Sequence, residues 1–439
     1  MTVTAADVAG PLARYARRVH ALAGERHHVA SPLGAWLLLA LAGPASAGET
    51  RPSLSAALGC DVPAAAQLAA ALLAAPHPAV LAAAAAWHRA GLSTPGLSRW
   101  QAGLPAAVES GVLPGPAARD EWARTRTLGL IGRFAVELTP DVALVLATAL
   151  ATRVSWARPF DLAPARALGS SSPWAARLGR VLRTPEGPGH EAFIAASAAA
   201  GDVAVHAARA RDGLLVTSVA AAPGVPAGDV LAAAYDLGVS LVTGAPVARR
   251  SLFDLPLGEG PGADGALWTV REQAVSTTAP DGREETGRAV LPAWSARSEH
   301  DLSRADLGFA GAAAALAGLL GLAGYRYAAK QAAAARYSRT GFEAAAVSAQ
   351  AVAMSAVRRR RGVRRTAELR FGRPFAVVAV ATDERARRGQ ASARGLAGRR
   401  ERVADRETRP PTAWHGLPVF GAWVAEPEDA EPGDRPATG

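Results

Sequence analysis

The chain has 439 residues, half of them apolar, which is enough for one large core or for two smaller ones. Its single cysteine, Cys60, excludes a disulfide framework, a zinc knuckle and an iron–sulfur site within one chain. The formal net charge of +10 comes almost wholly from arginine, yet few aromatic residues interleave with the arginines, which argues against nucleic-acid or polyanion binding.

The N-terminal third of the chain predicts helices followed by one strand. Residues 5–23 carry apolar side chains at helical spacing. Ser31-Pro32 supplies a cap and a first-turn proline for a second, deeply buried helix. A third helix is expected over residues 48–58. The alanine- and leucine-rich residues 65–86 predict another helix and then a buried strand from Val80.

The apolar residues 33–47 end in Ala-Ser-Ala, as a signal peptide does before its cleavage site. Their distance from Met1 and the Ser31-Pro32 pair favour a buried helix instead. Residues 308–329 come closest to a membrane span, but glycines and Arg326 interrupt them. We therefore expect no membrane segment, and a cytoplasmic location rather than secretion.

The middle and the end of the chain predict mostly strands. A helix is expected over residues 120–129, and the apolar run from Val142 to Ser155 predicts a central strand. Glycine and proline predict a loop over residues 258–265, and the arginine-rich residues 382–412 predict an exposed, disordered insert. Further short strands are expected over residues 203–207, 213–218, 252–257, 289–295, 325–335, 367–371, 375–380 and 414–425.

One Ala-rich stretch, from Gly341 to Ser355, suits two conformations. Its six alanines favour a helix. Its alternation, which places Phe342, Ala344 and Ala346 on one face, equally allows a strand. Such a segment, late in a long chain, is either a linker or a switch.

The sequence carries no recognisable catalytic constellation. There is no Gly-x-Ser-x-Gly elbow, no phosphate loop and no paired-histidine metal motif. His27 and His28 are adjacent, so they point apart on a helix or a strand and make a poor metal pair. We therefore predict a protein that is not an enzyme and that needs neither a metal nor a cofactor.

The order of several segments resembles the serpin family of serine protease inhibitors, in a divergent, bacterial-type form. The resemblance spans residues 28–427, apart from the arginine-rich insert. The segments that carry it are Ser31-Pro32 with Gly48-Glu49-Thr50, Asp120-Glu121-Trp122 with Thr127 to Ile131, Trp156 with Pro159-Phe160-Asp161, Leu291-Pro292 with His300-Asp301-Leu302, Gly341 to Ala346, Arg373-Pro374-Phe375, and Val419-Phe420-Gly421.

This resemblance implies an α+β fold with three β-sheets, eight to nine helices and an exposed reactive-centre loop. The implied division of the chain is a single serpin-like domain over residues 1–427, with the loop over residues 339–366, the insert over residues 382–412 and a polar tail over residues 428–439. The implied function is suicide inhibition by a monomer. A serine protease attacks the loop, forms an acyl-enzyme, and is trapped when the cut loop inserts into the main sheet.

The resemblance also assigns roles to residues of the loop. Gly341, Phe342, Glu343 and Ala344, Ala345 and Ala346 form the hinge. Family spacing places the cleaved bond between Ser355 and Ala356, which suits a subtilisin-like or elastase-like protease. Alternative sites for trypsin-like proteases are the residues of the arginine block, namely Arg358, Arg359, Arg360 and Arg361.

Two departures from the family pattern affect this interpretation. Phe342 occupies a hinge position where inhibitory members carry threonine or serine, and overpacking there costs about 1–3 kcal/mol. The resemblance implies a sheet-opening region that comprises Ser31, Thr148, Trp156 and Gln331. There, Thr148 replaces the family's usual asparagine and Gln331 replaces its usual histidine. Gly34 replaces a usual serine. The side chains of Thr148 and Gln331 can still form hydrogen bonds.

Three functions stay open from the sequence. The first is an irreversible serine protease inhibitor of subtilisin-, elastase- or trypsin-like enzymes. The second is a non-inhibitory serpin-like protein that serves as a substrate, carrier or binding module. The third is an anion-binding protein that uses the arginines of residues 358–365 and 382–412. Ala344 to Ala346 favour the first function over the second, and Phe342 opposes it.

Overall fold

A computed structural model describes residues 5–134, 142–152, 154–260, 266–322, 324–341, 360–383 and 412–432. The predicted hinge residues Phe342 to Ala346 and the predicted bond Ser355-Ala356 lie outside the described residues, as do Arg358 and Arg359. Most of the predicted arginine-rich insert, residues 384–411, also lies outside them.

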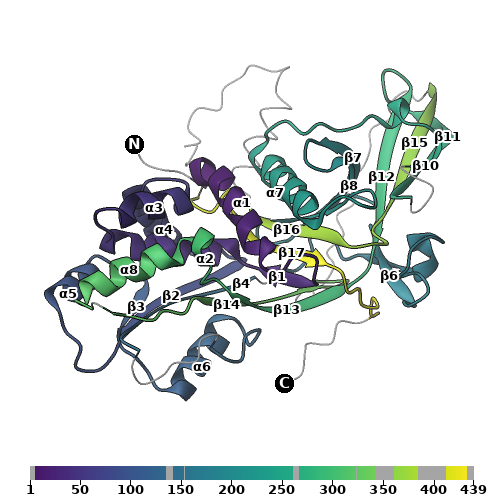
Figure 1. The fold of residues 1–439 in the computed structure, drawn as a ribbon. Coiled ribbons are helices and arrows are strands. Elements are labelled where there is room, and N and C mark those ends of the chain that lie inside the picture. The colour runs from purple at the N-terminus through teal and green to yellow at the C-terminus, as the bar shows by residue number, and fades with distance from the viewer. Residues whose placement is uncertain are drawn as a thin grey trace, which may run out of the picture.

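Most of the helices, α1 to α6, belong to the N-terminal part of the chain (Figure 1). The most buried of them, α2, begins at Ser31, whose Oγ accepts a hydrogen bond from the Gly34 amide at 3.2 Å. Three-residue and four-residue 3-10 turns connect several elements. The α-helices are α1 (Ala5–Ala21), α2 (Pro32–Ala42), α3 (Thr50–Leu58), α4 (Val62–Ala74), α5 (Pro95–Ala102), α6 (Pro116–Arg126), α7 (Ala227–Thr243) and α8 (Phe309–Leu319).

Within the part of the chain that the structure describes, no single helix is both long and apolar enough to cross a membrane. The pair α3 and α4 satisfies the length and composition requirement together, but it bends by 51° at its break.

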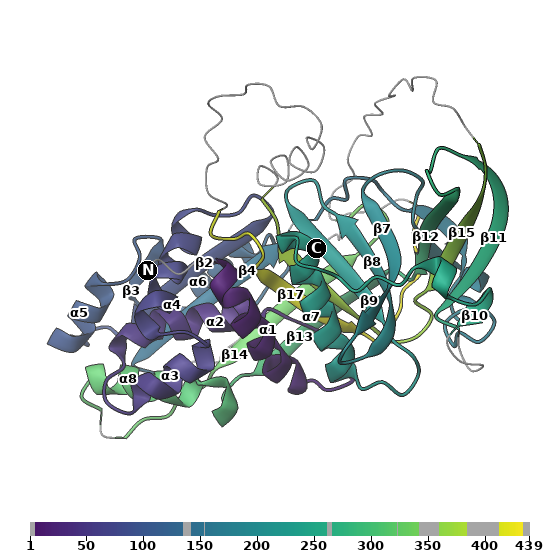
Figure 2. The same ribbon diagram turned by 90° about the horizontal axis from the view of Figure 1, so that it is seen from above.

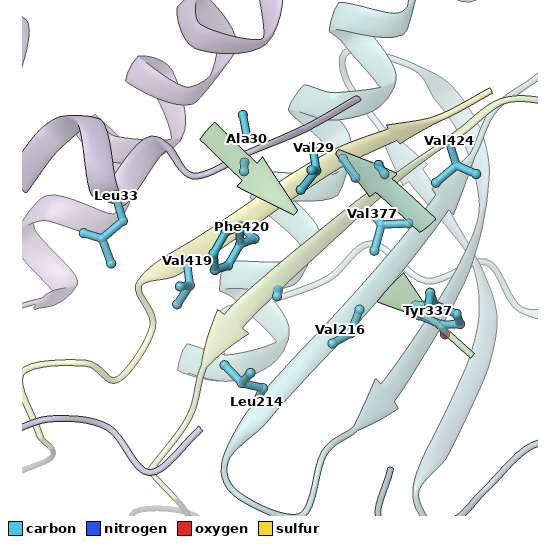
Figure 3. Close-up of a cluster of buried hydrophobic side chains, with 14 of the residues drawn as sticks. Val29, Ala30, Leu33, Leu214, Val216, Tyr337, Val377, Val419, Phe420 and Val424 are labelled. Carbon is cyan, nitrogen blue, oxygen red and sulfur yellow. The ribbon is translucent and has the colours of Figure 1, made fainter. Parts of the chain in front are cut away.

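A first six-stranded sheet forms the centre of the core. Its order is β1-β17-β16-β9-β8-β7, and α7 packs against β16 and β9. Apolar side chains of β1, β9, β16 and β17 meet Leu33 of α2 and Tyr337 between the layers (Figure 3). The strands are β1 (His28–Ala30), β7 (His190–Ser197), β8 (Gly201–Arg209), β9 (Leu214–Ala220), β16 (Phe375–Ala381) and β17 (Pro418–Val424).

A second six-stranded sheet lies at the far end of the molecule from α5 and α8 (Figures 1 and 2). Its order is β10-β11-β15-β12-β6-β5. The strand β15 lies inside the sheet with a neighbour on each side, and its start at Arg360 corrects the predicted loop, whose last residues, 360–366, belong to this strand. The strands are β5 (Asp161–Pro164), β6 (Arg180–Arg183), β10 (Gly258–Gly260), β11 (Trp268–Thr277), β12 (Arg283–Leu291) and β15 (Arg360–Arg370).

The remaining strands form two separate ladders, which we call the divided sheet. One ladder has the order β3-β2-β4 and the other pairs β13 with β14. The two ladders meet at one end, where the Trp156 amide donates to the Thr340 carbonyl at 3.2 Å. The strands are β2 (Val80–His88), β3 (Val108–Val112), β4 (Leu144–Thr152), β13 (Trp294–Asp301) and β14 (Lys330–Tyr337).

The predicted α+β class is confirmed, and most predicted elements lie where the sequence placed them. Three predictions need correction. The predicted loop over residues 258–265 contains the strand β10 (Gly258–Gly260), and the strand predicted over residues 289–295 is divided between the end of β12 and the start of β13. Leu252–Asp254 forms a 3-10 helix instead of the start of a strand. The Ser251 hydroxyl accepts from the Phe253 amide there, and the carbonyls of Leu252 and Leu255 accept from Arg365 instead of from a neighbouring strand.

The polar tail also begins later than residue 428. The Glu428 amide donates to the Ala293 carbonyl at 2.7 Å, and the Asp429 carboxylate accepts from the amides of Gly179 and Arg180. Ala430 is buried. Residues 428–430 therefore belong to the folded body, because they form hydrogen bonds with the start of β6 and with Ala293, between β12 and β13.

Candidate functional site: the hinge junction

The predicted hinge begins at a junction between the two halves of the divided sheet. Both β4 and β14 end there, and Gly341 forms an isolated bridge with Ser155. The Phe160 amide donates to the Arg339 carbonyl at 3.0 Å, just beyond the Trp156–Thr340 hydrogen bond. The two ladders are thus fastened at the point where the chain enters the predicted loop.

Trp156, predicted as a sheet-opening residue, anchors this junction. Its indole is buried and donates from Nε1 to the Ser338 carbonyl at 2.9 Å. Its ring lies 4.8 Å from the Tyr337 ring and 5.8 Å from the Phe160 ring, measured between centroids. Since aromatic pairs at these distances are stabilising, the end of β14 is held on the end of β4 by packing as well as by backbone hydrogen bonds.

Gly341 is required by the geometry of the junction. Its φ of +93° lies in the left-handed region that side chains disfavour. A Cβ at this position would lie 2.0 Å from the Val154 carbonyl oxygen and 2.9 Å from the Ser155 Cα. The predicted hinge therefore starts at a residue that no side chain can replace without moving β4 away from the junction.

The other predicted sheet-opening residues lie together behind the divided sheet. Gln331 at the start of β14 accepts from the Ser31 amide at 2.9 Å and donates to the Ser31 carbonyl at 2.7 Å. The Ser31 hydroxyl donates to the Val419 carbonyl at 2.9 Å. Thr148 of β4 donates to the Gly34 carbonyl at 3.0 Å. The two side chains that depart from the family pattern thus form a hydrogen-bonded network on the first turn of α2.

Gly34 of α2 lies beside both β4 and β14. A methyl group at this position would lie 3.5 Å from Gln331 of β14 and 3.6 Å from Leu150 of β4. Both strands therefore face each other across the N-terminal turn of α2.

Along their length, β4 and β14 have free facing edges within the described residues. β4 pairs only with β2, and β14 pairs only with β13. Both strands run toward the junction, since each ends there. A segment that left Gly341 and reversed direction to lie between them would be antiparallel to both, the arrangement that hydrogen-bonds most favourably.

The far end of the predicted loop is fixed in the second sheet. Arg360 and Arg361, two of the alternative cleavage positions, lie in β15 opposite Thr277 and Ser276 of β11. The Arg360 guanidinium also donates to the Ala279 carbonyl. A protease must draw several residues in extended form into its cleft, and the pairing of Arg360 and Arg361 with β11 opposes this.

A buried histidine cluster, which the sequence analysis missed, joins four elements near the start of the chain. His20 Nδ1 lies 2.8 Å from His28 Nε2, and His20 Nε2 lies 2.8 Å from the Tyr235 hydroxyl. His300 Nε2 lies 2.7 Å from the Val29 carbonyl oxygen. The cluster connects α1, β1, α7 and β13, and therefore links the first sheet to the edge of the divided sheet.

The histidines of this cluster are held neutral by burial. Burial lowers the pKa of His28 to about 4, and it lowers the pKa values of His20 and His300 below their usual range. His27 lies just before β1 and is not part of the cluster, since its Nε2 contacts the Ser295 carbonyl oxygen at 2.8 Å. Among the described residues, no group of three or more potential ligands is placed to hold a metal ion.

Comparisons with known proteins identify the fold but no sequence family. No protein-family model matches the chain, and no curated protein matches it in sequence. Human glycosylated kallistatin is 14% identical, with 97% of this chain and 99% of kallistatin covered at a TM-score of 0.60. The thermophilic serpin tengpin in its native state is 12% identical, with 95% and 93% covered at a TM-score of 0.59.

Human thyroxine-binding globulin in complex with thyroxine is also similar in structure. It is 12% identical, with 98% of this chain and 100% of that chain covered at a TM-score of 0.58. These relationships span almost the whole chain, so the chain has the serpin fold. At this level of identity they establish the fold alone, and the fold serves both inhibitors and carriers such as this globulin.

Proposed function

We propose that this protein is a serpin-type suicide inhibitor of serine proteases and not an enzyme. The observation that carries the proposal is the divided sheet: β4 and β14 present unpaired edges to each other, and the chain enters the predicted loop from their shared end at Gly341. A cut loop that reversed at Gly341 would complete the sheet between them. The protein therefore combines a loop for a protease to cut with a gap in the sheet that the cut loop can fill.

The chemistry in this proposal comes from the protease. Its serine attacks a loop carbonyl, the peptide bond breaks, and the loop stays attached to the enzyme as an acyl ester. Insertion of residues 342–355 as a strand of about 3.3 Å per residue would carry the ester roughly 46 Å along the sheet. The protease is then distorted against the far end of the inhibitor, and deacylation slows because its oxyanion hole is disturbed.

We place the cleaved bond between Ser355 and Ala356. Both residues belong to the segment 342–359, between the two fixed ends of the loop at Gly341 and Arg360. Cleavage after Arg360 or Arg361 is disfavoured because both residues are held in a strand that pairs with β11. A serine before the bond favours a subtilisin-like or elastase-like target. Trypsin-like cleavage at Arg358 or Arg359 is the second choice.

A second function, that of a protease substrate or carrier, is favoured by Phe342. The junction at Gly341 is already crowded by the backbone of Val154 and Ser155. A phenyl ring that enters the sheet directly after Gly341 must find space there, and overpacking of this kind costs about 1–3 kcal/mol. Slower insertion gives the acyl-enzyme time to hydrolyse, which converts an inhibitor into a substrate.

The proposal is tested by incubating the protein with subtilisin, elastase and trypsin in separate reactions. We expect an SDS-stable complex with at least one of them, together with a product cut at Ser355. Phe342→Thr is expected to raise the ratio of complex to cleaved product. Val357→Ala, on the other side of the bond, serves as a matched control. If every protease gives only cleaved product, with the natural chain and with Phe342→Thr, the inhibitor proposal is wrong and the substrate function stands.

A further inference from the structure

Two histidines of the first sheet lie beside the hinge junction. His190 of β7 and His206 of β8 stack on each other, with ring centroids 5.4 Å apart and an angle of 20° between the ring planes. We propose that this histidine pair is an acid-sensitive latch on the hinge junction. With both rings neutral the pair supports the junction, and a proton bound by either ring loosens it.

The hydrogen bonds of the histidine pair fix where its protons lie. His190 Nε2 lies 2.7 Å from the Arg158 carbonyl oxygen, which can only accept, so Nε2 carries a hydrogen. In the neutral ring His190 Nδ1 is then an acceptor, and His206 Nε2, 3.1 Å away, must donate to it. The remaining nitrogen, His206 Nδ1, is buried without a hydrogen-bond partner among the described residues. The neutral pair therefore has a single arrangement, in which both N–H groups are used.

An additional proton has no favourable position in this arrangement. On His190 Nδ1 it would face the N–H of His206 and break the hydrogen bond between the two rings. On His206 Nδ1 it would create a fully buried cation with an unpaired N–H, which is costly. Burial accordingly lowers the pKa values of both rings below their usual range.

The charged groups around the histidine pair do little to offset this cost. The Arg158 guanidinium lowers the pKa of His190 further, and the Asp161 carboxylate raises it. The charge that acts on His206 is that of His190, which lowers its pKa. Burial raises the pKa of the Tyr337 hydroxyl, so this neighbour stays uncharged. The acidic side chains of the adjoining elements contact other groups, namely Glu191 with Arg249, Asp202 with Arg250, Glu186 with Arg288, Glu284 with Arg364, Glu285 with Ser251, and Glu368 with Arg370.

Phe160 connects the histidine pair to the hinge junction. The centroid of its ring lies 4.4 Å from that of His190 and 5.5 Å from that of His206. The same ring lies 5.8 Å from the Tyr337 ring of β14, and the Phe160 amide donates to the Arg339 carbonyl at 3.0 Å. Phe160 thus packs on the histidines while it holds the end of β14. Separation of the two histidine rings therefore removes a support of the junction.

Acid should favour opening of the hinge junction, because the histidines bind protons more readily once they are exposed. An exposed histidine has a pKa near 6.5, whereas the pKa values in the closed junction are lower. The stabilisation is therefore complete above pH 6.5 and is lost progressively below it. At about pH 5, one ring that gains its proton only on opening shifts the equilibrium roughly thirty-fold. Under the proposed function this opening would ease entry of the cut loop, but the latch itself does not depend on that function.

The test measures amide hydrogen exchange in the uncut protein between about pH 7.5 and pH 5, with the intrinsic pH dependence of exchange divided out. The reporters are the amides of Trp156 and Phe160, which donate to carbonyls across the junction. Amides of β9 are the reference, so that a general loss of stability in acid is divided out as well. We expect exchange at the reporters to rise at least roughly ten-fold relative to the reference.

Variants assign this rise to the histidine pair. Glutamine has a donor for the Arg158 carbonyl and an acceptor for His206, and it does not bind a proton in this pH range. His190→Gln should therefore reduce the rise at least roughly three-fold, and His190→Gln combined with His206→Gln should abolish it. His88, which is also partly buried but lies at the end of β2, provides the matched control His88→Gln, which should keep the full rise.

Two results would contradict the latch. One is a reporter-to-reference ratio that does not change with pH in the natural protein. The other is a rise of equal size in His190→Gln and His88→Gln, which decides the matter even if the double variant does not fold. Neither result bears on loop insertion. Conversely, a failure to form a complex with any protease would contradict the proposed function and leave the latch in place.

Discussion

At the scale of single residues, Gly341 carries the strictest constraint. Its positive φ and the Val154 carbonyl oxygen, 2.0 Å from where a Cβ would lie, both oppose any side chain. We expect Gly341→Ala to lower the free energy of unfolding by about 2–4 kcal/mol, the sum of backbone strain and overpacking. Urea unfolding at equilibrium measures this change.

The control for this substitution is Gly24→Ala. Gly24 also has a positive φ, of +60°, but nothing lies within 4 Å of its Cβ position. It therefore isolates the backbone contribution, about 1–2 kcal/mol. Equal losses for the two variants would show that the contact with Val154 does not constrain the hinge.

Gln331 connects β14 to the start of α2. Its amide satisfies both the N–H and the C=O of Ser31, at the turn where α2 begins. Gln331→Leu removes both partners and should destabilise the protein by about 2 kcal/mol, because partly buried backbone groups are left unpaired. The exposed neighbour Lys330 provides the control Lys330→Leu, which should change the free energy of unfolding by less than about 0.5 kcal/mol.

At the scale of elements, the histidine cluster predicts acid sensitivity. His20, His28 and His300 are neutral in the folded protein because burial lowers their pKa values. The unfolded chain, with histidine pKa values near 6.5, binds protons first as the pH falls. The stabilisation is therefore complete above pH 6.5 and is lost progressively as the pH falls toward 4, the region of the folded pKa of His28.

The readout for this prediction is the slope of unfolding free energy against pH between 6.5 and 4. The double variant His20→Gln, His28→Gln should flatten the slope, whatever its absolute stability. Some slope should persist, because burial also lowers the pKa values of His190 and His206. The half-buried His88 at the end of β2, outside the cluster, supplies the control His88→Gln. An unchanged slope in the double variant would show that the cluster does not bind protons on unfolding.

At the scale of the whole molecule, local sequence patterns predicted much of the fold. Ser31-Pro32 marked the start of α2, and the apolar run before Trp156 marked β4, because caps and apolar runs act over a few residues. The order of these short patterns was enough to indicate the serpin fold. The same order placed a strand before Gly341, and β14 (Lys330–Tyr337) lies there in the structure, while the predicted hinge residues after Gly341 lie outside the described residues.

Features that depend on distant contacts could not be predicted in this way. The strand β11 mixes charged, polar and apolar residues, and half of its side chains are exposed, most of them in one run, so it carries no clear alternation. The histidine cluster joins residues as far apart as His20 and Tyr235, which are brought together by helix packing. The gap in the divided sheet could not be predicted either, because strand pairing is set by contacts between segments far apart in the sequence.

The central claim is that the cut loop becomes a strand between β4 and β14. Amide hydrogen exchange over β4 (Leu144–Thr152) and β14 (Lys330–Tyr337), before and after cleavage at Ser355, tests it most directly. The account predicts slower exchange in both strands after cleavage, with β11 unchanged. If cleavage is complete and exchange in β4 and β14 stays the same or becomes faster, the loop does not insert and the account is wrong.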